Sequence, residues 1–192
     1  MILIWHNPLK NRFKIMSAIL KLKHWQIFLF LIGSIGLYVY FSGTHIDLGF
    51  LTSKELKAIF GVLGILIMFL WILAIGLLTN KAPTNPYRFR KGLYILSIVL
   101  CIIGYSVLHI TPLLIDKIPN LGLMVSPLTP LTFFGIIYTF YNVSRSLKSL
   151  EVGRKVEFSE CIIDALLLLV SPIGVWIIQP KINKIIKLSN DK

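Results

Sequence analysis

The chain has 192 residues, of which 56% are hydrophobic and 15% are charged, and its formal net charge is +12. Soluble domains are about 45–50% apolar and about 25% charged, so this composition excludes an ordinary soluble domain. The basic residues cluster in short segments between long apolar runs. That distribution is typical of a membrane protein and argues against nucleic-acid binding.

Residues 1–24 carry basic side chains and no acidic one, and their apolar residues are spaced as on one face of a helix. The basic residues are Lys10, Arg12, Lys14, Lys21 and Lys23. This pattern predicts an amphipathic helix that lies on anionic lipid head groups, and the alternative is a solvated basic leader that orients the chain. Both interpretations place the N-terminus in the cytoplasm.

Four apolar runs of transmembrane length follow, at residues 25–41, 58–78, 92–111 and 122–142. They predict an all-α, polytopic helical bundle, in which residues 25–192 form a single membrane-embedded domain. The connector between the second and third runs is basic and contains two prolines, so we expect it on the cytoplasmic side.

The boundaries of the fourth helix can be predicted from its capping residues. Ser126 is expected to cap its beginning, with Pro127 at the first helical position, where the missing N–H of proline costs nothing. The helical pattern continues beyond the apolar run, and Gly153 offers a C-terminal stop.

A fifth apolar run, residues 161–178, allows two paths. The sequence Ser-Pro-Ile-Gly at 171–174 interrupts it, and the chain can turn back toward the cytoplasm there. Such a hairpin would leave only Lys54, Lys57 and Lys117 on the outer side, which agrees with the positive-inside rule. An unbroken helix would instead rise about 27 Å, enough to cross the membrane. The charge distribution favours the hairpin.

Two ionisable residues lie inside apolar runs, and each is a candidate functional residue because a charge in hydrocarbon is costly. Asp164 is expected near the inner end of its helix, where Arg154 and Lys155 can compensate its charge, so a role in assembly is favoured over catalysis. His109 is expected near the outer end of another helix, as an interfacial side chain. About 20 Å of membrane depth would separate Asp164 from His109, which excludes a direct proton relay.

The C-terminal region contains a recognisable pattern at residues 134–138 and 144–148, followed by the sequence PIGVWIIQPKIN at residues 172–183. These stretches resemble a set of small, uncharacterised bacterial multi-pass membrane proteins that end in a P-I-G-x-W-x-x-Q-P-K-I-N-like motif. The resemblance covers the last third of the chain and implies acidic residues near the start of the preceding helix, as at Glu160 and Asp164. It implies no activity.

The same motif has a physical interpretation. Pro172 and Gly174 favour a bend, and Trp176 suits a membrane interface. Gln179 and Pro180 are expected to begin a short surface helix that carries the basic tail.

The sequence shows no catalytic motif, since it lacks H-E-x-x-H, G-x-S-x-G, a P-loop and a glycine-rich dinucleotide fingerprint. Cys101 and Cys161 belong to no CxxC or His/Cys cluster, so neither a metal nor a cofactor is expected. The prediction is a non-enzymatic interaction or accessory subunit of a bacterial inner membrane. Its expected partners are the lipid bilayer and a membrane protein or a second copy. The alternative is a small oligomeric transporter or channel component.

Overall fold

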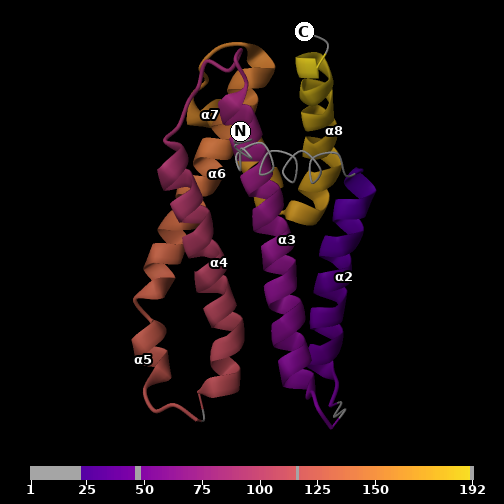
Figure 1. Cartoon of the computed structure of the whole chain (residues 1–192), viewed down its shortest axis with the longest axis vertical. Helices are drawn as coiled ribbons and strands as arrows, with labels where there is room; N and C mark the ends of the chain where they lie inside the picture. Colours follow the sequence, from indigo (N-terminus) through magenta and orange to yellow (C-terminus); the bar gives the residue numbers. More distant parts are fainter. Residues whose placement is uncertain (1–22, 46–48, 116, 191–192) are drawn as a thin grey trace, which may run out of the picture.

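The computed structural model describes residues 23–45, 49–115 and 117–190, and every regular element within these ranges is a helix (Figure 1). The helices are α2 (His24–Gly43), α3 (Ser53–Lys81), α4 (Lys91–Leu114), α5 (Leu121–Val125), α6 (Leu128–Val152), α7 (Phe158–Leu169) and α8 (Ser171–Asn190). The predicted amphipathic segment 1–24 lies outside the described residues, apart from its last two positions.

Four of the described helical segments are long and apolar enough to cross a membrane, namely Trp25–Gly43, Ser53–Lys81, Lys91–Leu114 and Leu121–Val152. They confirm the predicted all-α fold with four apolar segments of spanning length. The third helix extends beyond the predicted end, because α4 passes through Pro112 to Leu114.

The long helices run alternately up and down, and α3 lies at the centre, in contact with α2, α4 and α6 (Figure 1). Its central position explains why Phe69, Trp71, Ile72 and Ile75 of α3 are almost completely buried. We name the two ends of the bundle by their residues. The basic end holds the connector between α3 and α4 and the C-terminal part of α8, and the far end holds residues 44–45, 49–52, 115 and 117–121.

Local capping explains where two of the helices begin and end. Thr52 caps α3, since its side chain accepts a hydrogen bond from the backbone N–H of Glu55 while its own backbone N–H donates to the Glu55 carboxylate at 2.8 Å. Gly153 ends α6 as predicted, with a φ of 78° that favours glycine. The predicted beginning of α6 was wrong: Pro127 is its N-cap, and the Ser126 hydroxyl donates to the Leu123 carbonyl in α5.

Small residues bring the helices close together. A Cβ on Gly76 of α3 would overlap the ring of Tyr94 in α4, and a Cβ on Gly104 of α4 would overlap the side chain of Thr132 in α6. Such contacts let helix backbones approach without a side chain between them, as is common in membrane bundles.

The fifth apolar run forms two helices. α7 ends at Leu169, α8 begins at Ser171, and the two pack against each other so that the chain returns to the basic end (Figure 1). The 12 residues of α7 rise about 18 Å, well short of the roughly 30 Å of a hydrocarbon core. The turn satisfies its own backbone, since the Ser171 hydroxyl donates to the Leu168 carbonyl at 2.9 Å and the Gly174 N–H to the Val170 carbonyl at 3.0 Å.

The break in this hairpin falls one residue before the predicted turn sequence. Pro172 lies in the first turn of α8, and Gly174 packs directly against the Leu167 carbonyl, where a Cβ would not fit. The predicted new helix at Gln179 and Pro180 was wrong, because α8 continues through both residues.

Candidate functional site

Gln179 of the C-terminal motif is a buried joint between α8 and the central helix. The indole Nε1 of Trp71 donates a hydrogen bond to Gln179 Oε1 at 2.7 Å, and both side chains are almost completely buried. Gln179 Nε2 donates in turn to Asn183 Oδ1 at 3.2 Å. A hydrogen bond between two buried polar groups satisfies both of them and fixes the register of α8 against α3.

Asp164 holds the two helices of the hairpin together. Its Oδ1 lies 3.1 Å from Lys181 Nζ, which is also 3.5 Å from a carboxylate oxygen of Glu151 in α6. Glu151 pairs further with Lys148 at 3.1 Å. The partner of Asp164 is therefore Lys181, 17 residues later, and not Arg154 or Lys155 as the sequence suggested. This alternating row of charges joins α6, α7 and α8.

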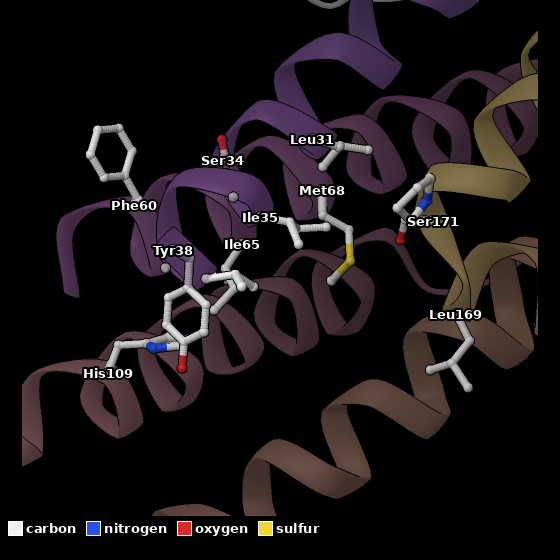
Figure 2. A pocket seen from close by; sticks show the side chains of 14 residues that line it. Leu31, Ser34, Ile35, Tyr38, Phe60, Ile65, Met68, His109, Leu169 and Ser171 are labelled. Carbon is white, nitrogen blue, oxygen red and sulfur yellow. The ribbon is translucent and has the colours of Figure 1, made fainter. Parts of the chain in front are cut away.

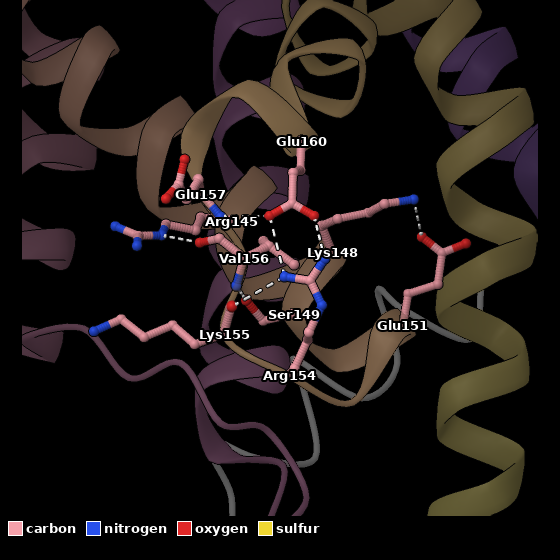
Figure 3. A network of polar contacts seen from close by, with 9 residues as sticks. All are labelled: Arg145, Lys148, Ser149, Glu151, Arg154, Lys155, Val156, Glu157 and Glu160. Atoms are coloured by element: carbon pink, nitrogen blue, oxygen red, sulfur yellow. Dashed lines mark hydrogen bonds and ion pairs between the residues drawn. The ribbon is translucent and has the colours of Figure 1, made fainter.

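The connector between α6 and α7 is fixed by a second polar network (Figure 3). Arg154 forms an ion pair with Glu160, which lowers the pKa of that carboxyl below its ordinary value. Arg145 Nε donates to the Val156 carbonyl at 2.7 Å, and the Val156 N–H donates to Ser149 Oγ at 3.2 Å. The position of the short connector is thus fixed by hydrogen bonds to its backbone and by an ion pair of its side chain Arg154.

Asn85 of the basic connector forms a junction that sequence reasoning missed. Its Nδ2 donates to the Thr79 carbonyl at 2.8 Å and to Ser146 Oγ at 2.9 Å, while its Oδ1 accepts from the Tyr87 N–H at 3.0 Å. The Tyr87 hydroxyl donates to Asn142 Oδ1 at 2.9 Å. Nothing local in the sequence of the connector predicts that Asn85 meets Ser146, 61 residues later.

His109 and Trp176 lie elsewhere. His109 packs edge to face on Tyr38 of α2, with ring centroids 5.3 Å apart, and borders a cavity of about 440 Å³ (Figure 2). Trp176 packs edge to face on Phe28 of α2 at 5.4 Å, and Pro180 is exposed on α8. His109 and Asp164 thus make their contacts in separate parts of the molecule.

Within the described ranges, no group of three His, Cys, Asp or Glu residues is placed to hold a metal ion. In comparisons with family models, with curated proteins and with solved structures, nothing matches this chain. The resemblance of the C-terminal motif therefore stays a prediction.

Proposed function

We propose that this protein is a non-enzymatic accessory subunit of a bacterial inner-membrane assembly, with the basic end of its bundle in the cytoplasm. The observation that carries the proposal is the use of the polar groups that the sequence singled out. Asp164 and Gln179 both make helix-to-helix contacts that seat the α7–α8 hairpin. Side chains used in this way stabilise the packing of the helices, so we assign the function of the protein to its exposed surfaces.

The outer face of the hairpin is the surface we assign to a partner membrane protein. It presents exposed apolar side chains from both helices, which are Ile163, Leu166, Ile173, Trp176 and Ile177. Because the short α7 reaches only part of the bilayer depth, a partner helix can pack on the hairpin and extend past its tip. Van der Waals packing of this kind is the main source of helix association in lipid.

A photo-crosslinking residue tests the assignment. One variant carries it at Ile163 on α7, which is 69% exposed, and the control carries it at Phe134 on α6, which is 68% exposed but on another face. We expect a discrete protein adduct from Ile163 in intact membranes and none from Phe134. An adduct with the mass of two copies would favour the oligomeric transporter, and the same pattern at both positions would contradict a dedicated docking face.

The proposed orientation rests on the charge distribution at the two ends. The basic end exposes Lys81, Arg88, Arg90, Lys91 and Lys155, which suits the anionic lipid head groups of the cytoplasmic leaflet. We expect a cysteine at Ser189, in a background without Cys101 and Cys161, to resist a membrane-impermeant thiol reagent in intact cells. A cysteine at Ser42 near the far end should react readily. Labelling of position 189 in intact cells would overturn the orientation.

A further inference from the structure

A cavity of about 440 Å³ lies below the tip of the α7–α8 hairpin, between α2, α3 and α4. Figure 2 shows its two ends: Tyr38 and His109 lie at one, and Leu169 and Ser171 at the other. Its volume falls within the range of about 300–1,000 Å³ that is usual for ligand sites. The wall is largely apolar and partly open to the surface, so its natural contents are hydrocarbon.

The place of the cavity follows from the short hairpin. Its lining on α3 runs from Phe60 to Met68, a rise of about 12 Å along the half of the bundle nearer the far end. Leu169 and Pro172 of the hairpin tip close it at mid-height. In the proposed membrane orientation, this is the half of the bilayer that α7 and α8 do not reach.

The end of the cavity formed by Tyr38 and His109 has the cation Lys57 beside it, and both rings carry groups that can donate hydrogen bonds. Lys57 Nζ lies 5.2 Å from the centre of the Tyr38 ring, and His109 packs on the edge of the same ring. Within the part of the chain that the structure describes, neither the Tyr38 hydroxyl nor the His109 imidazole makes a hydrogen bond. Among the described residues, the other charges in the first turn of α3 are Lys54, which is exposed, and Glu55, whose carboxylate accepts a hydrogen bond from the Thr52 backbone N–H.

We propose that this cavity binds one acyl chain of an anionic phospholipid from the outer leaflet, with the head group held by Lys57, Tyr38 and His109. The apolar wall matches the chain, and the ammonium group with its two neighbouring donors matches a phosphate. Gly61 shapes this end, because it lets the His109 ring pack directly on the backbone of α3. The inference rests on the proposed membrane insertion, and it is independent of any partner on the hairpin.

The first test concerns the head group. The purified full chain is exchanged into mild detergent containing equal amounts of phosphatidylglycerol and phosphatidylcholine, and bound lipid is identified by native mass spectrometry. We expect one phosphatidylglycerol per chain, and Lys57→Gln should lower its occupancy relative to phosphatidylcholine about fivefold, as one lysine near an anionic head group contributes. Lys54→Gln is the matched control and should leave the preference unchanged.

The second test concerns the cavity itself. Ile35 lines it and is 45% exposed, whereas Ile32 of the same helix is 41% exposed and does not line it. Ile35→Trp should displace phosphatidylglycerol and phosphatidylcholine from the cavity, and Ile32→Trp should displace neither lipid. Equal retention in the two tryptophan variants would overturn the site. A bound free fatty acid in place of a phospholipid, or an equal effect of the two lysine variants, would overturn the proposed occupant.

Discussion

At the basic end of the bundle, Asn85 joins polar side chains in one network, whereas toward the far end Tyr38 and His109 border a cavity. Asn85 alone joins Thr79, Ser146 and Tyr87 in a buried network. In contrast, Tyr38 and His109 meet beside a cavity, and the described part of the chain offers their polar atoms no hydrogen bond. Because a buried polar group such as the Asn85 amide needs a partner, the first arrangement serves stability, whereas the half-buried Tyr38 and His109 keep their polar atoms available to a ligand.

The largest effect is expected from breaking the network at the basic end. Asn85→Leu removes the donor of the buried hydrogen bonds to Thr79 and Ser146 and the acceptor of the Tyr87 N–H, so we expect a loss of about 3 kcal/mol in the free energy of unfolding. Thermal unfolding in a fixed detergent measures it. Thr84→Ala, an exposed change in the same connector, is the control, and an equal effect of both changes would show that the network contributes little.

A pair of glycine variants compares the two ends directly. Gly76→Ala forces a methyl group against Tyr94, which is fully buried and donates to the Ile72 carbonyl at 2.6 Å, so a loss of about 2 kcal/mol is expected. Gly61→Ala meets the His109 ring in a similar way, but that ring can move into the cavity. We expect this second loss to stay below about 1 kcal/mol. Equal losses of stability in the two glycine variants would contradict the idea that the basic end is tightly packed and the far end leaves open space.

The joint between α3 and α8 should contribute less than the Asn85 network, because Trp71 reaches Gln179 through one hydrogen bond, whereas Asn85 bonds to three other residues. A double-mutant cycle of Trp71→Phe and Gln179→Leu should give a coupling free energy of about 1 kcal/mol. The control cycle combines Trp71→Phe with Ser42→Ala, a distant pair that should be additive. A coupling free energy near zero in the first cycle would mean that apolar packing alone positions α8 against α3.

Asp164→Asn is expected to cost less than about 1 kcal/mol. The amide oxygen can still accept a hydrogen bond from Lys181, and Lys181 keeps its contact with Glu151 at 3.5 Å. The measurement is the yield and thermal stability of the folded variant. If the variant folds and inserts normally yet abolishes a phenotype of the deletion strain, Asp164 is a functional carboxylate and the assembly role is wrong.

The smallest effect concerns an exposed ion pair of the basic end. Arg154 lowers the pKa of Glu160, so the pair stabilises the fold above the ordinary carboxyl pKa, and this contribution is lost as the pH falls through the lowered value. Exposed pairs contribute little. We expect Arg154→Gln to unfold slightly earlier than the natural chain at neutral pH and at the same temperature in acid. A difference that persists in acid would indicate packing by Arg154.

The sequence alone determined the class of the fold and the position of its apolar helices. Hydropathy over about 20 residues is a local property, and so is the glycine at 153 that ends α6. For that reason four spanning segments could be predicted, with boundaries close to the observed ones except at the end of the fourth, which runs on to Val152. The cap assignment at Ser126 failed because Ser126 ends the short helix α5, where its hydroxyl donates to the Leu123 carbonyl.

Only the tertiary structure decided which polar residues meet. Trp71 bonds to Gln179 across 108 positions, Asn85 to Ser146 across 61, and Asp164 to Lys181 across 17. No periodicity or spacing encodes these pairs, because each depends on how separate helices cross and on the depth at which the hairpin turns. The cavity beside His109 has the same origin, since it lies between α2, α3 and α4 beyond the point where the α7–α8 hairpin turns back.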